Sequence, residues 1–377
     1  MVEKIEQGLR IMKKVLLIDY YGTCDENGKV VGHSPKVLKE YGDLIKGEYV
    51  RSVAVSPCLI DEIAGEQAQD FHEIHSLKYN IMTSDMTSVG KRVKDKFKLF
   101  YNLYQVFQIE NYDIFWFYKT DFFLALYFYL FISGKRKKEN KPKIVVLLYQ
   151  NSFGKNVLGR ILNQIDYSGC NNADAIIITQ EGFKDLRIPA LYIPDYYYDA
   201  QKYEKYRVME KEDKVVCIGT MSPYKQLMPL VEAFNVNGLP LEIRGFFFNK
   251  EQYQLLLESK KENILIEDAI LTEEEYYQTL AGAKYAILPY DMELYQCRTS
   301  GVLQECVFLD IIPIAPALLL EQNHIPGLGY HMIEELKDRK FIEQNMQWRK
   351  VCKSLRDECD LEKVRQRLLY FLGRLFR

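Results

Sequence analysis

Residues 290–316 read YDMELYQCRTSGVLQECVFLDIIPIAP, and this stretch decides the fold of the chain. An apolar strand that ends at Leu288-Pro289 leads into a polar loop, then into a helix predicted to open near Thr299-Ser300-Gly301, and finally into a second strand at 311–315. The first N–H groups of a helix have no partner within it, and the helix dipole adds positive charge there. The stretch therefore predicts a phosphate site at Ser300 and Gly301, with the Glu305 carboxylate one turn further in.

Short apolar runs alternate with helical patterns through the rest of the chain. Runs such as VLLI at 15–18 and KIVVLLY at 143–149 are continuously apolar, which is typical of parallel strands covered on both faces. Strands are predicted at 51–56, 113–118, 175–179, 191–194, 215–219, 241–244, 264–266 and 285–288. The alternation predicts an α/β fold with a parallel sheet in each half of the chain.

The length of 377 residues favours two domains. We expect an N-terminal domain over 1–205 and a C-terminal domain over 206–357, joined near the highly charged segment 199–214. Residues 57–90 show no clear period, so we expect irregular structure there. Residues 1–11 look like an appendage, because MKKVLLID from Met12 is how a first strand of this kind usually begins.

The apolar run 121–132, DFFLALYFYLFI, is followed by the basic segment 134–138. It is too short to span a membrane, and a buried helix is the preferred interpretation. The alternative is an interfacial helix whose basic flank meets anionic lipid, which would be a peripheral contact with the inner membrane surface.

The composition excludes several classes of protein. Fifty basic and 52 acidic residues give a formal net charge of −2, so there is no whole-chain charge that favours nucleic acid. The eight cysteines form no CxxC pair and show no zinc-ligand spacing, and those in apolar runs, such as Cys217 and Cys306, read as small buried residues. No secretory signal is visible, and we expect a reducing, cytoplasmic compartment.

Four stretches of the second half, in this order and spacing, resemble the C-terminal domain of GT-B glycosyltransferases, most closely the family-4-like group of bacterial polysaccharide enzymes. They are IGTMSPYK at 218–225 with LVEAF at 230–234, LEIRG at 241–245, LTEEEYYQTLAGAKYAILP at 271–289, and the segment from Ser300 to Ile314. The resemblance implies two Rossmann-like domains that face each other across a cleft. It also implies that the helical tail 358–377 packs back on the N-terminal domain.

The resemblance implies a donor site for a nucleoside diphosphate sugar, without a metal or any other cofactor. It assigns Gly219, Thr299, Ser300 and Gly301 to donor binding, and Glu305 to the ribose hydroxyls. The alternative for Glu305 is an ordinary glutamate on the helix surface. No G-x-G-x-x-G is present, so NAD-dependent chemistry is disfavoured.

Basic side chains must stabilise the departing diphosphate in such an enzyme. Lys225 matches the family's lysine, although a loop lysine is as often simply solvated. The family's second basic residue falls at Thr220 and is absent here. Arg244 or Arg298 could replace it, and we favour Arg298 because it immediately precedes the predicted phosphate-binding turn.

The first glutamate of the family's E-x7-E pair falls at Cys297 and is also absent. Its loss leaves retaining and inverting stereochemistry both open. His33, in the loop after the first strand, is the catalytic candidate of the N-terminal half.

The sequence thus predicts an enzyme that moves a sugar to a glycan or lipid-linked acceptor in surface polysaccharide or glycoconjugate synthesis. The alternative is an inactive GT-B subunit that stabilises or recruits a partner glycosyltransferase. A sugar-nucleotide epimerase is a third option, for which His33 is poor support.

Overall fold

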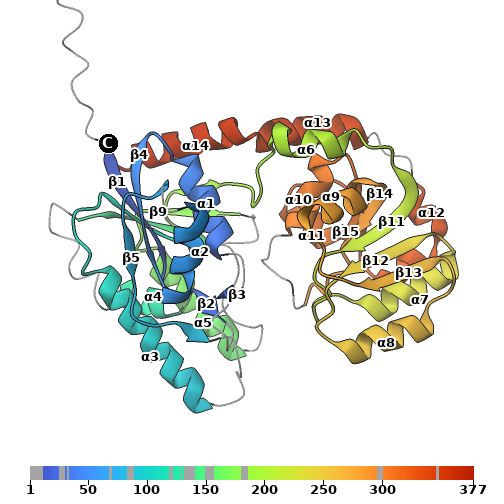
Figure 1. The fold of residues 1–377 in the computed structure, drawn as a ribbon, viewed down its shortest axis with the longest axis horizontal. Helices are drawn as coiled ribbons and strands as arrows, with labels where there is room; N and C mark the ends of the chain where they lie inside the picture. Colours follow the sequence, from blue (N-terminus) through green and yellow to red (C-terminus); the bar gives the residue numbers. More distant parts are fainter. Residues whose placement is uncertain are drawn as a thin grey trace, which may run out of the picture. The chain divides into compact units, whose positions relative to one another are not determined.

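The computed structural model describes residues 12–24, 30–31, 34–67, 70–82, 89–118, 122–128, 130, 141–148, 157–179, 186–293, 295, 300–344 and 348–377. His33, Cys297, Arg298 and Thr299 lie outside these ranges. The chain divides into two compact units (Figure 1). The N-terminal unit holds the described residues up to Thr179, residues 186–193 and Arg365–Arg377, and the second unit holds Pro194–Val364.

The N-terminal unit is built on a parallel sheet of seven strands in the order β10-β9-β8-β7-β1-β4-β5. Its interior strand β1 (Lys13–Asp19), which pairs with β7 and β4, is buried from Val15 onward. The other strands are β4 (Tyr49–Val55), β5 (Ile74–Ser76), β7 (Ile114–Phe117), β8 (Lys143–Leu148), β9 (Ala175–Ile178) and β10 (Ala190–Tyr192). A small separate sheet contains β2 (Thr23–Cys24), β3 (Val30–Val31) and β6 (Ile81–Met82).

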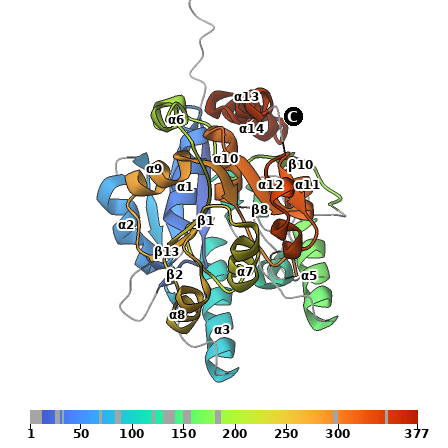
Figure 2. The same cartoon turned by 90° about the vertical axis from the view of Figure 1, so that its right-hand side faces the viewer.

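Helices cover both faces of the N-terminal sheet. The chain leaves β1 toward β4 and β5 through α1 (Ser34–Leu44) and α2 (Pro57–Gln67). It builds the other half of the sheet through α3 (Val89–Val106), α4 (Phe122–Tyr127) and α5 (Val157–Cys170). Because such crossovers are right-handed, the two groups lie on opposite faces, and contacts between α1 and α2 and from α4 to both α3 and α5 agree. Figure 2 shows α3 and α5 from a second direction.

The structure tests two of the sequence predictions about this unit. The expectation of irregular structure over 57–90 is wrong, because the segment contains α2, β5, β6 and the start of α3. The apolar run forms the short helix α4, in which Leu124, Ala125 and Tyr127 are buried, so the described part of the run is a core helix. No helix of the described residues is long and apolar enough to cross a membrane.

The second unit contains a parallel sheet of six strands in the order β13-β12-β11-β14-β15-β16. The predicted α/β class, with one parallel sheet in each half, is therefore confirmed. The strands are β11 (Glu212–Ile218), β12 (Leu241–Gly245), β13 (Ile264–Asp268), β14 (Ala283–Ile287), β15 (Ile312–Pro316) and β16 (Leu328–Tyr330).

The helices of the second unit are α6 (Ala200–Arg207), α7 (Leu227–Asn237), α8 (Lys250–Ser259), α9 (Glu273–Ala281), α10 (Gly301–Phe308), α11 (Ala317–Gln322), the 3-10 helix η3 (Ile333–Lys337), α12 (Arg339–Ile342) and α13 (Trp348–Cys359). The charged segment predicted as a linker forms α6, capped by the Asp199 side chain, and the first residues of β11. The sequence did not predict that β11 begins at Glu212, because its first residues, Glu212 and Asp213, are exposed and charged.

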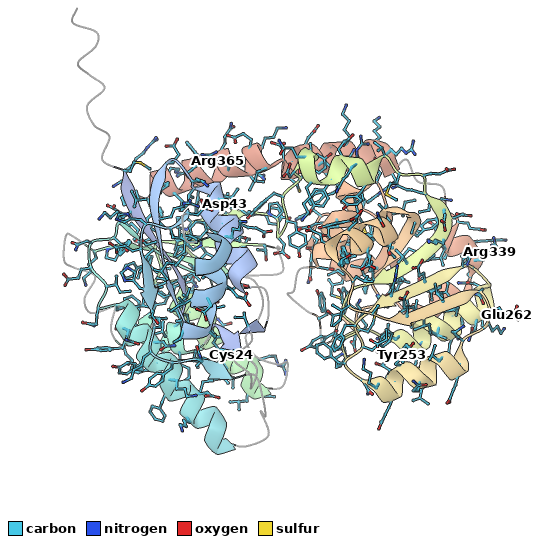
Figure 3. All side chains as sticks on the ribbon, viewed as in Figure 1. Cys24, Asp43, Tyr253, Glu262, Arg339 and Arg365 are labelled. Atoms are coloured by element: carbon cyan, nitrogen blue, oxygen red, sulfur yellow. The ribbon has the colours of Figure 1, made fainter. Side chains whose placement is uncertain are left out.

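The last helix, α14 (Leu361–Arg374), is divided between the two units at Val364. In the N-terminal unit, Leu368 and Leu372 are buried, and Lys13 Nζ lies 3.7 Å from the ring centroid of Phe376. Arg365, labelled in Figure 3, donates from Nη2 to the carbonyl of Lys46 at 2.6 Å. These contacts tie the C-terminus to β1 and to the segment that follows α1.

A buried ion pair supports the second unit at the end of α10. Arg356 on α13 donates to the Asp310 carboxylate and, at 3.0 Å, to the carbonyl of Val307. Arg207 on α6 donates to the other Asp310 oxygen at 3.1 Å. Asp310 has φ 57°, a conformation in which aspartate and asparagine are favoured over other side chains.

We expect Asp310→Ala to lower the free energy of unfolding by about 3 kcal/mol or more, because it leaves the buried Arg356 charge without a carboxylate. Asp310→Asn keeps an acceptor and the left-handed backbone, so its loss should be smaller. Urea unfolding followed by circular dichroism measures both. Equal midpoints for the parent protein and Asp310→Ala would contradict the assignment.

Candidate active site

The residues predicted to bind a donor gather where the strand order of the second sheet reverses. The central strand β11 pairs with β12 on one side and with β14 on the other. The chain therefore leaves β11 in one direction and returns to its other side later, so the loops after β11 and β14 start from neighbouring strands. Open α/β sheets bind ligands beyond the carboxyl ends of the strands at such a switch point.

Backbone hydrogen bonds hold these two loops together. Lys225 and Tyr290 form an isolated antiparallel bridge. The N–H of Gln226 donates to the carbonyl of Pro289 at 2.7 Å, and the N–H of Asp291 donates to the carbonyl of Tyr224 at 2.8 Å. The loop that carries Lys225 is thus fixed to the loop that leads into α10.

Two glycines allow the ends of β11 and β12 to approach closely. Gly219 has φ +92° and Gly245 has φ +153°, both conformations that side chains disfavour. A Cβ atom at Gly245 would lie 1.8 Å from the carbonyl oxygen of Gly219. The backbone at Gly219, a predicted donor-binding residue, therefore requires glycine at two positions. Position 219 needs it for the positive φ, and position 245 needs it for the close approach.

Lys225 is buried at the switch point, with 7% of the residue exposed. Its ammonium donates to the carbonyl of Ile218, the last residue of β11, at 2.9 Å, and lies 3.8 Å from Met221 Sδ. Within the part of the chain that the structure describes, no carboxylate forms an ion pair with it. The alternative of a solvated loop lysine is therefore wrong.

Helix α10 begins where the sequence predicts, with Ser300 at the N-cap in an extended conformation. The Ser300 hydroxyl does not cap the helix and lies 3.3 Å from the Tyr290 hydroxyl. The rings of Tyr290 and Tyr295 are stacked at 3.8 Å. The hydroxyls of Ser300 and Tyr290 thus lie together at the start of the helix.

Gly301 is needed at this start because an aromatic ring covers it. A Cβ atom there would lie 2.1 Å from Cε2 of Tyr196. The N–H of Tyr196 donates to Gln304 Oε1 at 2.6 Å, which fixes the segment before α6 to the first turns of α10. Tyr196 could not be predicted from the sequence, since nothing there links it to a helix that begins over 100 residues later.

Glu305 is buried, with 3% of the residue exposed, so the alternative of a surface glutamate is also wrong. Two adjacent tyrosines of α9 donate to its carboxylate: Tyr276 to Oε2 at 2.6 Å and Tyr277 to Oε1 at 2.8 Å. Burial, and after it the Glu305 charge, raises the pKa of both tyrosines, so both remain neutral phenols that donate.

The remaining predicted residues are not brought to this group. Arg244 lies on β12, where its guanidinium pairs with Glu267 of β13 at 2.8 Å and donates to Thr279 Oγ of α9 at 3.0 Å. Its charge is therefore already balanced by a carboxylate. The predictions for His33, Arg298 and Thr299, and the Cys297 departure, concern positions outside the described residues.

Solved structures resemble the chain over nearly its whole length. A sucrose-phosphate synthase from Thermosynechococcus elongatus matches with a TM-score of 0.65 and 12% identity, covering 97% of this chain and 99% of that one. HepE of Anabaena, solved in complex with UDP, matches with a TM-score of 0.60 and 12% identity, covering 96% and 100%. This chain has the GT-B fold.

A third match is a UDP-forming α,α-trehalose-phosphate synthase from Burkholderia xenovorans in complex with glucose-6-phosphate. Its TM-score is 0.61 at 8% identity, and the match covers 95% of this chain and 100% of that one. No protein-family model matches the chain, and no curated protein matches its sequence. The GT-B fold expected from the four motif stretches is therefore confirmed by structure, at identities that show the fold alone.

Replacing Gly245 tests the close approach of the two strand ends. Gly245→Ala should lower the stability, because its Cβ would collide with the Gly219 carbonyl. Gly238→Ala is the matched control: its φ is also positive, at +70°, but of the described atoms none lies within 4 Å of the added Cβ. We expect about 1 kcal/mol for the control, from backbone strain alone, and a clearly larger loss for Gly245→Ala. Equal losses in thermal unfolding would contradict this account.

The tyrosine pair is tested by removing one hydroxyl at a time. Tyr277→Phe leaves one oxygen of a buried carboxylate without its donor, so the free energy of unfolding should fall by about 1–3 kcal/mol. Tyr253→Phe is the control. It also removes one tyrosine hydroxyl, but at a half-buried ring on α8 outside the pair, and it should change stability little. An unaltered unfolding midpoint in Tyr277→Phe would show that the hydroxyl does not hold Glu305.

Proposed function

We propose that this protein is a glycosyltransferase that moves a sugar from a nucleoside diphosphate sugar to a glycan or lipid-linked acceptor. The observation that carries the proposal is the buried ammonium of Lys225, on a loop that backbone hydrogen bonds join to the loop leading into α10. An ammonium that has lost its hydration is costly unless an anion replaces the water. Its nearest protein partners are a carbonyl oxygen and a thioether, neither of which carries charge.

A diphosphate suits this position for two further reasons. The N-terminus of α10 presents N–H groups that cannot be paired within the helix, and these favour an anion. The loops after β11 and β14, which carry Lys225 and Ser300, are joined by backbone hydrogen bonds. One phosphate group could therefore meet both sources of positive potential. UDP in HepE and glucose-6-phosphate in the trehalose-phosphate synthase support nucleotide and sugar ligands for a chain of this fold.

In the proposed reaction the bond between the anomeric carbon and the terminal diphosphate oxygen breaks, and the acceptor oxygen bonds to that carbon. Lys225 and the first turn of α10 stabilise the negative charge that develops on the leaving diphosphate, and no metal ion is required for this step. The acceptor's proton passes either to the departing phosphate, with retention, or to a base of the N-terminal unit, with inversion. Arg298 stays the candidate for a second positive charge.

Glu305 is the proposed contact of the ribose hydroxyls, and Tyr276 and Tyr277 set the direction of its carboxylate. Because both tyrosines are neutral donors, they stabilise the charge without cancelling it. A cation in their place would neutralise the carboxylate. We place the reaction in surface polysaccharide or glycoconjugate synthesis, in the cytoplasm, with a peripheral membrane contact where the acceptor is lipid-linked.

Lys225→Met tests the central assignment, since it keeps the length and removes the charge. Calorimetry with UDP, GDP and dTDP sugars should show Kd rising about tenfold or more for whichever donor binds, as expected for losing a charge-assisted hydrogen bond. Stability should hold or rise, because an uncompensated buried charge is removed.

Lys284→Met is the control, because Lys284 is exposed on β14 and pairs with Asp213 at 3.0 Å. It should leave donor affinity unchanged. Failure of the parent protein to bind any of the three donors at millimolar concentration would overturn the proposal. So would donor affinity that is equal in Lys225→Met and the parent.

A further inference from the structure

Helix α3 carries a row of exposed aromatic side chains. Phe97 is 71% exposed, and Tyr101 and Tyr104 are also exposed. These positions are four and three residues apart, so they lie along one side of the helix. Leu99, Leu103 and Val106 are buried and hold the opposite side against the unit. An aromatic row on the solvent side of a helix has no role in the core.

Basic residues accompany this row. Residues 91–98 read KRVKDKFK, which has five basic residues and one acidic residue, Asp95. Asp95 accepts a hydrogen bond from Lys98 at 3.0 Å, and Lys94 is exposed. Lys78 Nζ, from the loop before β6, lies 5.0 Å from the ring centroid of Tyr101. The exposed side of α3 is therefore both aromatic and positively charged.

Helix α5 carries a second exposed apolar row. Val157 is 67% exposed, and Leu158, Ile161 and Ile165 are exposed as well. The last three are separated by three and four residues, so they form a stripe along the helix. Isolated exposed aliphatic residues are ordinary, but a continuous row of them marks an interaction surface.

Both rows lie on the same face of the N-terminal sheet, since α3, α4 and α5 are successive crossovers on that face, with α4 packed between the other two. Each helix runs antiparallel to the strands of the sheet. Consequently, the N-terminal ends of α3 and α5 lie at the carboxyl edge of the sheet, and both project beyond it in Figures 1 and 2. Leu130, after α4, adds an exposed apolar side chain to this layer.

We propose that this surface, formed by Phe97, Tyr101 and Tyr104 with Lys94 on α3 and by Val157, Leu158, Ile161 and Ile165 on α5, docks on an anionic lipid bilayer. Lipid phosphates match the lysines, and the boundary between head groups and acyl chains accepts aliphatic side chains and tyrosines. A bilayer presents negatively charged head groups directly beside a fluid apolar layer. The surface of a folded protein seldom combines the two.

The inference deepens the proposed function, on which it rests for the choice of a lipid-linked acceptor over a free glycan. Membrane docking itself needs no glycosyl transfer. Vesicle binding is therefore measured without donor, and donor binding is measured without vesicles, so that failure of one proposal is distinguishable from failure of the other.

The experiment sediments the full chain with vesicles of phosphatidylcholine alone or with phosphatidylglycerol added. We expect a higher partition coefficient on the anionic vesicles, and a lower one at high salt. Phe97→Ser and Leu158→Ser should each lower it about tenfold, because each removes an apolar side chain from the lipid. Lys94→Gln should lower it about fivefold on anionic vesicles and leave neutral ones unchanged.

Val236→Ser is the matched apolar control, since Val236 is 65% exposed on α7 of the second unit. Lys353→Gln, at an exposed lysine of α13, is the matched charge control. Neither should change vesicle binding, and none of these surface changes should move the unfolding midpoint. Absence of vesicle binding would overturn the inference. Binding that ignores Phe97→Ser, Leu158→Ser and Lys94→Gln would also overturn it, because the membrane contact would then lie elsewhere.

Discussion

Parallel pairing on both sides of β11 is the constraint on which the candidate site depends. A parallel strand cannot be reached by a tight turn, so each neighbour of β11 arrives through a helix, and every strand of the sheet ends at the same edge. The strand order reverses at β11, so the loop of Lys225 and the loop of Ser300 start from neighbouring strands. The hydrogen bonds from Gln226 to Pro289 and from Asp291 to Tyr224 then fix the two loops to each other. The loop of Lys225 and the loop that leads into α10 are thus joined within the protein itself.

The two charged side chains of the site have neutral polar groups as hydrogen-bond partners. Lys225 is held by a carbonyl and a thioether, and Glu305 is held by two phenols. Among the described residues no carboxylate pairs with Lys225, and the two phenols that donate to Glu305 are neutral. Arg244 shows the contrast, because Glu267 already balances it in the same sheet. A buried charge with neutral partners keeps its field for a ligand, whereas a paired one mainly supports the fold.

Sequence periodicity was sufficient for the elements that bury one continuous apolar run. The strands on both sides of α10 and the helix start at Ser300-Gly301 follow from apolar runs and a Ser-Gly turn. Helix α2 was missed because PCLIDEIAGEQ has little difference between its two sides. The burial of Lys225 could not be predicted, since a lysine near a proline in a loop usually faces water. Tyr276 and Tyr277 were read only as helix residues, because their acceptor is 28 or 29 positions away.

The two departures from the resembled family offset each other in charge. Thr220 stands where the family has a basic residue, and Cys297 stands where it has a glutamate. One positive and one negative charge are missing at these two positions, so the two changes by themselves leave the net charge of the site as in the resembled family, and Arg298, the candidate replacement, would add one positive charge. Losing the basic residue alone would weaken the electrostatic attraction for the leaving group, and losing the glutamate alone would strengthen it. The paired change keeps that attraction and removes a carboxylate that could accept hydrogen bonds from sugar hydroxyls. In the proposed reaction, the departures therefore bear on which sugar is accepted, while diphosphate binding depends on Lys225 and the start of α10.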